Sequence, residues 1–229
     1  MEDSFLLMKY LLNILLATTA FLSTLNCSAQ FLSDFRGKPV NEQRYVQVSG
    51  SPFYNKNFLK GEVTFTNKNI KNVKGYLNYD QVQDIILFKP NYEDKAAIEI
   101  TDQIDKFSML TENGDAINFI RLESIGLTDA LRFAEELLSG KLRLLKRTKK
   151  KILETQVYNS ANIEKTVVQE TSYILVKDNK AILLKQDRNS FLSALSDQEE
   201  TLKKYLKDQK INFKQDQDVV KLLKYYLSL

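Results

Sequence analysis

Residues 58–89 read FLKGEVTFTNKNIKNVKGYLNYDQVQDIILFK, and their pattern predicts three β-strands in succession. Val63 and Phe65 alternate with polar residues, and the same alternation continues from Val73 to Tyr79. A period of two places every second side chain on one face, which is typical of a half-buried antiparallel strand. The run from Val82 to Phe88 is more continuously apolar and predicts a strand that is covered on both faces.

Outward from this stretch, the chain continues to predict strands. Short strands are expected at Tyr45–Val48, Ala96–Ile104, Phe107–Leu110 and Ile117–Leu122, and a hairpin at Tyr173–Lys185. The Asn113-Gly114 pair between two of these runs is a strong signal for a tight hairpin turn. The polar segment from Ile152 to Gln169 is interpreted as a loop.

Two structures are open for residues 127–140. Helical spacing connects four apolar residues, namely Leu127, Leu131, Ala134 and Leu138. The alternative is a strand that includes Phe133, a turn at Ser139-Gly140 and a return strand from Lys141 to Lys146.

The C-terminal part of the chain changes to helical patterns. Arg188–Leu195 predicts a short helical segment. Ser196 and Glu199 have capping-box spacing, which predicts a helix that begins there and extends to about Asp208. A last amphipathic helix is expected to begin near Asp216.

The first 29 residues predict a secretory signal peptide. An apolar run follows Lys9, and the small residues Ser28 and Ala29 predict cleavage before Gln30. Met8 is an alternative start to Met1, and a retained N-terminal anchor is the alternative to cleavage. Cys27, the only cysteine, lacks the context of a lipoprotein signal, so the exported chain would have no disulfide.

Together these patterns predict an α+β fold that is mainly β. We expect residues 30–186 to form an antiparallel sheet curled into a roll or open barrel. Two or three short helices in residues 187–229 are expected to pack on it as a C-terminal unit.

Five segments follow one another along the chain: GSPFYNKNFLKGEV (50–63), YLNYDQVQDIILFK (76–89), LLSGKLRLLKR (137–147), YILVKDNKAILLKQDRNSFLSAL (173–195) and YLKDQKINFKQDQDVVKLLKYYLSL (205–229). Their order resembles a family of uncharacterised exported proteins from Bacteroidetes. The resemblance implies export and a strand-turn-strand around Ser139-Gly140, but it implies no activity.

Composition limits the possible chemistry. The chain has no histidine, which excludes a Ser-His-Asp triad and the usual zinc sites. No P-loop or dinucleotide-binding glycine pattern occurs, so no cofactor is expected. Asn113-Gly114-Asp115 and Asp178-Asn179 supply oxygens for calcium but lack EF-hand spacing, and both are interpreted as turns.

The most distinctive charged feature is the run KLRLLKRTKKK at positions 141–151. Its basic residues form the candidate ligand site: Lys141, Arg143, Lys146, Arg147, Lys149, Lys150 and Lys151. Lysines and arginines could hold an anionic envelope glycan or lipid. The simpler explanation is a solvated strand edge that deters aggregation.

We therefore expect a non-enzymatic protein of the periplasm or cell surface with a binding or structural role. Its partner would be an anionic glycan or lipid, or another envelope protein; no nucleic acid and no transmembrane span after cleavage are expected.

One alternative is a small-ligand or lipid carrier that uses the curled sheet. A second is a carboxylate-dependent glycan hydrolase, with candidates Glu93, Asp94, Glu99, Asp102 and Asp105. Tyr76, Tyr79 and Tyr92 could stack on sugars, although packing is the simpler role.

Overall fold

The computed structural model describes residues 35–40, 42–128, 132–156, 163–178 and 180–229. Within these residues the chain is mainly β, with an antiparallel sheet followed by three short helices, which confirms the predicted fold class. The strands are β1 (Gly37–Pro39), β2 (Val48–Ser49), β3 (Leu59–Phe65), β4 (Val73–Asp80), β5 (Ile85–Lys89), β6 (Ile98–Ile100), β7 (Ile104–Leu110), β8 (Ala116–Arg121), β9 (Phe133–Leu138), β10 (Leu142–Gln156), β11 (Ile163–Lys177) and β12 (Lys180–Leu184). The helices are η3 (Glu42–Tyr45), η4 (Leu122–Ile125), α2 (Arg188–Ala194), η5 (Ser196–Gln198), α3 (Glu199–Gln209) and α4 (Asp216–Tyr226).

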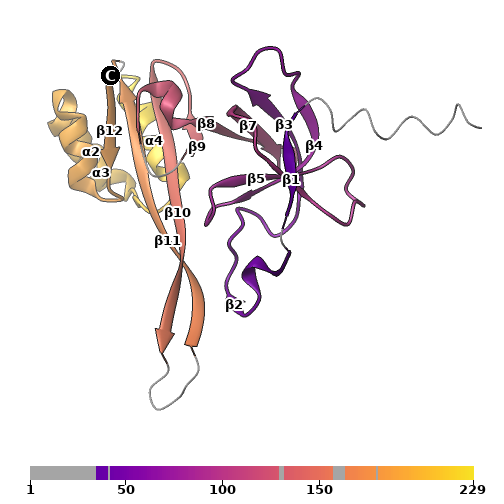
Figure 1. The fold of residues 1–229 in the computed structure, drawn as a ribbon. Coiled ribbons are helices and arrows are strands. Elements are labelled where there is room, and N and C mark those ends of the chain that lie inside the picture. The colour runs from indigo at the N-terminus through magenta and orange to yellow at the C-terminus, as the bar shows by residue number, and fades with distance from the viewer. Residues whose placement is uncertain (1–34, 41, 129–131, 157–162, 179) are drawn as a thin grey trace, which may run out of the picture.

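The described strands form a single sheet that curls without closing into a barrel. Their order is β1-β6-β5-β4-β3-β7-β8-β9-β10-β11-β12, and β2 pairs with β11. Neighbouring strands are antiparallel, whereas the short pairing of β2 with β11 is parallel. Figure 1 shows the curled strands β1 to β9 on one side and β10 to β12 with the helices on the other.

An aromatic core fills the inside of the curl. Phe107 and Phe119 stack with ring centroids 4.5 Å apart, and Tyr79 meets Phe107 edge-on at 5.6 Å. Phe133 from β9 completes this group, and all four side chains are buried. Side chains alternate between the two faces of β3 and β4, and the apolar ones pack around this aromatic group, as the sequence predicted. β5 is buried on both faces, also as predicted.

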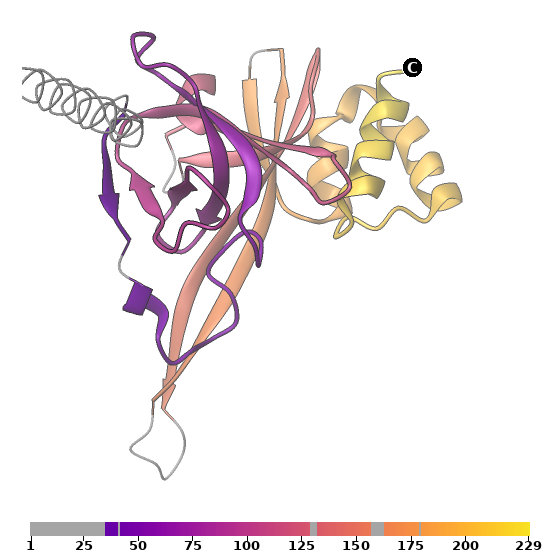
Figure 2. The ribbon, with the colours of Figure 1, turned by 90° about the vertical axis from the view of Figure 1, so that its right-hand side faces the viewer.

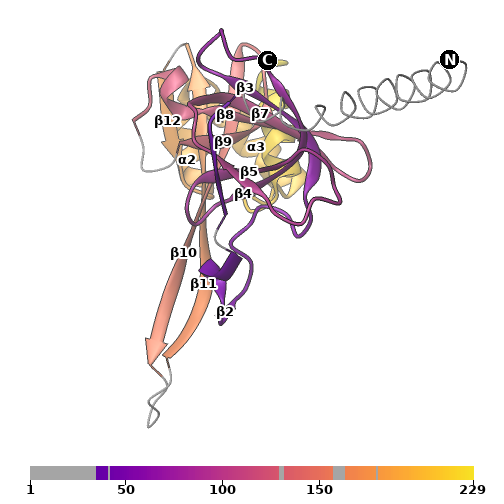
Figure 3. The same ribbon diagram turned by 45° about the vertical axis from the view of Figure 1, so that its right-hand side comes forward.

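The strands β10 and β11 form a long hairpin that projects from the body. They pair over their whole length, from Leu142 opposite Lys177 to Gln156 opposite Ile163. β9 pairs only with residues near the beginning of β10, so the rest extends as an arm of two strands, to which β2 adds only beside Lys165 and Thr166 of β11 (Figures 1 and 3). The prediction of a loop at Ile152–Gln169 was therefore wrong for residues 152–156 and 163–169, and residues 157–162 lie outside the described residues. Neither face of this arm is deeply buried, so the sequence lacks the apolar alternation that marks a half-buried strand.

The three α-helices cover one face of β10, β11 and β12, on the side away from the curled strands in Figure 2. Leu144 and Leu175 from the sheet join Phe191, Leu202 and Leu222 from the helices in one apolar cluster. This packing supplies the stability that such short helices lack alone.

Several local expectations are corrected by the structure. Residues 42–45 form a 3₁₀ helix, and the short strand nearby is Val48–Ser49 rather than Tyr45–Val48. The capping box does not form, because Ser196 begins the separate 3₁₀ turn η5 and α3 has no side-chain cap. Asp187 instead caps α2 by accepting the Ser190 N–H at 2.8 Å.

At residues 127–140 the strand alternative is correct from Phe133 onward, and the return strand extends much further than expected. Of the four residues at helical spacing, Leu127 and Ala134 contribute to one apolar cluster and Leu138 to another, while Leu131 lies outside the described residues. The predicted signal peptide lies outside the described residues. Among the residues that are described, no helix combines the length and apolarity that a membrane span requires.

Candidate functional site

The basic run at positions 141–151 is divided between the two faces of the hairpin. Side chains alternate along β10, so one face carries the odd-numbered residues Arg143, Arg147, Lys149 and Lys151. Lys146 and Lys150 lie on the opposite face, and Lys141 is exposed in the turn before the strand. The structure therefore does not gather the seven candidates into one patch.

Four of these residues have internal partners, Arg147 among them. Arg143 Nε donates to Glu136 Oε1 at 2.8 Å, and Lys146 Nζ donates to Asp216 Oδ2 at 2.5 Å. Lys150 Nζ donates to the backbone carbonyls of Phe53 at 2.7 Å and Ser51 at 3.2 Å. Burial lowers the pKa of Lys150. These cations hold the arm, α4 and the 50–54 loop together.

The remaining basic residues of β10 form what we call the arm row, namely Arg147, Lys149 and Lys151. Successive members are about 7 Å apart along the strand, since each residue advances by about 3.3 Å. The side chains of Lys149 and Lys151 make no hydrogen bond or ion pair with the described parts of the chain. Glu170 lies across from Lys149 in the register. Lys149 and Lys151 are therefore the members of the arm row that are available to a partner.

A polar cluster lies where the curled strands meet the helices. Glu135 on β9 receives a hydrogen bond from Tyr54, and Asp216 receives one from Tyr173 at 2.8 Å. Burial raises the pKa of Glu135, the nearby Asp216 carboxylate raises it further, and Lys146 opposes both. Burial also raises the pKa values of Tyr54 and Tyr173. Both carboxylates depend on the single Lys146 ammonium, so the cluster acts as a structural junction.

A pocket of about 240 Å³, which we call the outer pocket, lies on the face of β4, β5 and β6 that points away from the aromatic core. Its walls are apolar or aromatic: Val40, Tyr45, Phe53, Phe58, Leu87 and Ala97. The sheet contributes Leu87, while η3 and the 50–58 loop contribute the aromatic rings. Tyr45 and Phe53 meet edge-on with centroids 5.8 Å apart.

Charged residues at the outer pocket fall into two groups. Arg44 pairs with Asp80 at 3.6 Å and with Glu99 at 3.5 Å, and Lys38 pairs with Glu99 at 3.1 Å, so these two cations and two carboxylates balance one another. Lys89 and Lys95 are the second group. The Lys89 ammonium lies 4.8 Å from the centre of the Phe58 ring, and neither lysine forms an ion pair within the described ranges.

Asp80 is fully engaged inside the protein. Its Oδ1 accepts the backbone N–H groups of Val82 and Gln83 at 3.0 and 2.9 Å, which closes the turn after β4. Its Oδ2 accepts the Tyr45 hydroxyl at 2.6 Å and faces Arg44. Burial and this hydrogen bond raise the pKa of Tyr45. Asp80 therefore positions η3 against the sheet and has little capacity left for a ligand.

Three of the five carboxylates proposed for hydrolysis are committed to internal contacts. Asp102 pairs with Arg36 at 2.8 Å, which lowers the pKa of Asp102 against the effect of burial. Glu99 pairs with Arg44, and Asp94 Oδ2 accepts the Asn91 N–H at 2.8 Å. An aspartate or glutamate that is neutralised by arginine is poorly suited to donate or accept a catalytic proton.

Another pair of acids lines a polar groove of about 520 Å³, and the sequence did not single it out. Glu62 on β3 and Glu136 on β9 belong to this groove. Strands β7 and β8 lie between them, so their backbones are about 14 Å apart at about 4.8 Å per strand. Glycosidase carboxyl groups are about 5–9.5 Å apart. Glu136 is in addition held by Arg143, so the pair does not resemble a hydrolytic dyad.

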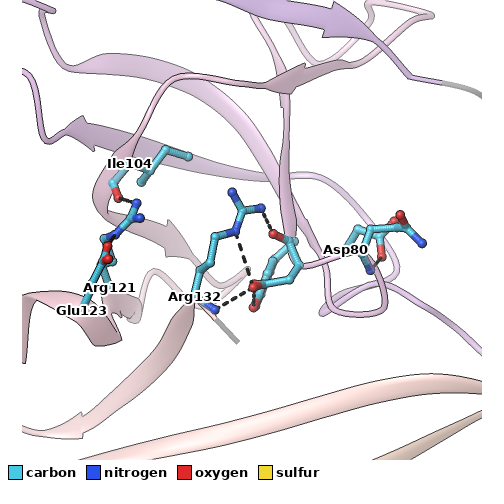
Figure 4. A network of polar contacts seen from close by, with 8 residues as sticks. Asp80, Ile104, Arg121, Glu123 and Arg132 are labelled. Atoms are coloured by element: carbon cyan, nitrogen blue, oxygen red, sulfur yellow. Dashed lines mark hydrogen bonds and ion pairs between the residues drawn. The ribbon is translucent and has the colours of Figure 1, made fainter. Parts of the chain in front are cut away.

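A third network, shown in Figure 4, holds the turn between β4 and β5. Asp84 has a left-handed backbone (φ 56°) and its carboxylate accepts the Tyr79 hydroxyl at 2.5 Å. It also accepts the Arg132 backbone N–H at 2.6 Å, and the Arg132 guanidinium donates to the Asp84 carbonyl. Burial raises the pKa of Asp84, while these donors oppose that rise. Both oxygens of the Asp84 carboxylate have partners inside the protein, so the network is structural.

The other candidates from the sequence have structural roles as well. Tyr79 is buried in the aromatic core, and Tyr76 packs on Tyr92 with centroids 5.3 Å apart. Asn113-Gly114-Asp115 forms the β7–β8 turn, with Gly114 at φ 86°. Within the residues that the structure describes, no group of three acidic or cysteine ligands is close enough to hold a metal ion.

Comparison of this chain with protein-family models, with curated proteins and with solved structures finds no match. The resemblance to exported proteins of Bacteroidetes therefore stays a prediction. The candidate sites are defined by the geometry of the chain itself, and these are the arm row and the outer pocket.

Proposed function

We propose that this chain is a non-enzymatic exported protein of the cell envelope or surface, which binds an anionic envelope glycan or lipid through the arm row. The observation that carries this proposal is the position of the half-buried Lys149 and the exposed Lys151, next to Arg147 on one face of a hairpin that projects from the body (Figure 3). Neither lysine has a hydrogen-bond or ion-pair partner in the described parts of the chain. A row of cations on a projecting element attracts polyanions and can reach a surface that the body cannot approach.

The non-enzymatic part of the proposal rests on the state of the acids. Asp80, Asp84 and Asp102 each receive several donors from their surroundings. Glu136 is paired with Arg143. Carboxylates in this state stabilise the fold and would need to break those contacts before they could act on a substrate.

The test compares two variants with the same change in charge. Lys149→Glu/Lys151→Glu reverses the two unpaired cations of the arm row, and Lys204→Glu/Lys207→Glu reverses two exposed lysines on α3. Binding to heparin and to phosphatidylglycerol vesicles is measured at low and high salt. We expect the wild type to bind at least one of them in a salt-sensitive manner, because exposed charges are screened by salt.

Loss of binding in the arm variant, with binding retained in the α3 variant, would support the arm row as the site. Preference for heparin or for vesicles would distinguish a glycan from a lipid. Equal losses in both variants would mean that only the overall charge matters, and absence of binding by the wild type would reject the proposal.

A second candidate function is that of a small-ligand carrier, which is favoured by the outer pocket. The inside of the curl is filled by aromatic side chains, so a ligand would occupy the opposite face of the sheet instead. A ligand there would meet apolar walls and the side chains of Lys89 and Lys95.

A further inference from the structure

We propose that the outer pocket binds a small organic carboxylate with an apolar aryl or alkyl body. The proposal is independent of the arm row, because the pocket lies on β4–β6 and the lead-in loops, whereas the arm row lies on β10. The apolar walls would contact the body of the ligand, and the lysines would bind its carboxylate.

The walls favour an apolar ligand. Phe53, Phe58 and Leu87 face the pocket together with the Tyr45 ring, and apolar surface that leaves water on binding stabilises the complex. The volume of about 240 Å³ equals the space of about eight water molecules at about 30 Å³ each. The ligand is therefore small, on the scale of a single aromatic ring with a short chain.

The charges favour an anion. Arg44 and Lys38 are balanced by the carboxylates of Asp80 and Glu99, so this group contributes no net charge. Lys89 and Lys95 remain at the pocket without an acidic partner in the described part of the chain. A single carboxylate would complement these two cations and form charge-assisted hydrogen bonds with them.

A cation is a poor fit for the same site. The carboxylate of Asp80 already accepts three hydrogen bonds and faces Arg44, so it offers no free acceptor. The Phe58 ring already has an ammonium group over it, from Lys89. An organic cation would therefore meet two like charges and no unoccupied aromatic face at Phe58.

The experiment uses 4-phenylbutyrate as the probe and 4-phenylbutan-1-ol as its neutral counterpart, titrated into the purified protein by calorimetry. We expect the acid to bind more tightly than the alcohol. In Lys89→Gln/Lys95→Gln, affinity for the acid should fall by about tenfold or more, whereas affinity for the alcohol should change little.

Three further variants make the test specific. Ala97→Met places a longer side chain in the pocket and should abolish binding of both probes. Lys71→Gln, at an exposed position before β4, should bind like the wild type. Lys149→Glu/Lys151→Glu should also bind the acid normally, which separates this proposal from the arm row. Thermal melting of each variant confirms that it is folded.

The proposal is overturned if the wild type binds neither probe at millimolar concentration. It is also overturned if the alcohol binds as tightly as the acid, or if the double lysine variant binds the acid as well as the wild type.

Discussion

The Lys146 ammonium and the Asp216 carboxylate lie 2.5 Å apart and join β10 to the first residue of α4. Asp216 also stands at the positive end of the α4 dipole, which favours a carboxylate there. Both side chains are largely shielded from water, with 26% and 30% of their surface exposed. A lysine that the sequence assigned to ligand binding therefore attaches the helices to the sheet.

This pairing predicts that Lys146→Met destabilises the protein. The substitution keeps the aliphatic stem but leaves Asp216 and Glu135 without their shared cation. We expect the free energy of unfolding in urea to fall by about 1.5–3 kcal/mol, which is typical for a lost hydrogen bond to a charged group. Lys149→Met, three residues along the strand, should change it by less than about 0.5 kcal/mol. Equal effects would contradict the junction role of Lys146.

The Glu135 carboxyl predicts a pH-dependent effect. Its folded-state pKa is raised by burial, so the folded state binds this proton more tightly than the unfolded state. The stability associated with the protonated form is complete below the ordinary pKa of glutamate and is lost as pH rises through the raised pKa.

Replacement by Glu135→Gln removes that titration while the amide oxygen can still accept from Tyr54. We expect the stability of this variant, relative to the wild type, to increase from about pH 4 to pH 7, as measured by urea unfolding. A difference that is constant with pH would show that the pKa of Glu135 is not raised.

The close approach of Phe88 to Gly75 predicts that this glycine cannot be replaced. A Cβ added at Gly75 would lie 2.5 Å from the Phe88 ring and 2.6 Å from the Lys89 carbonyl. Gly75→Ala should therefore lower the melting temperature, at a cost of about 1–3 kcal/mol for the overpacked core. Lys60→Ala, on the paired strand with an exposed side chain, should melt like the wild type. An unchanged melting temperature for Gly75→Ala would mean that the curl can open locally.

The arm predicts a gradient of hydrogen exchange along β10. Near its beginning β10 lies between β9 and β11, but residues Ile152–Gln156 pair with β11 alone. Isolated two-stranded ribbons are marginally stable in water. Amides of residues 152–156 should therefore exchange faster than those of residues 142–146 when followed by mass spectrometry. Uniform protection along the strand would indicate that another chain covers the arm.

Most of the sheet could be predicted from local patterns. Val63 and Phe65 alternate with polar residues because one face of β3 packs on the aromatic core, so burial is visible in the sequence as a period of two. The same reasoning identified the β7–β8 hairpin, α2, α3 and α4. It failed for residues 152–156 and 163–169, where strand pairing is not accompanied by burial of one face.

The candidate sites were harder to predict from the sequence than the sheet was. Alternation alone could have divided the basic run between two faces, since Lys149 and Lys151 are two residues apart while Lys150 lies between them. The outer pocket carried no comparable signal. Tyr45, Phe58 and Lys95 come from separate segments, and each one alone is an ordinary surface or packing residue.

The residue pattern was thus sufficient for a mainly antiparallel β fold with C-terminal helices, because strands and helices that bury one face repeat with fixed periods. Only the tertiary structure decided which cations hold the fold and which stay available. That distinction depends on partners such as Asp216 for Lys146 and the Phe53 carbonyl for Lys150, which lie 70 and 97 positions away in the chain. Contacts at such separations arise from the curl of the sheet and the docking of the helices, and no local period encodes them.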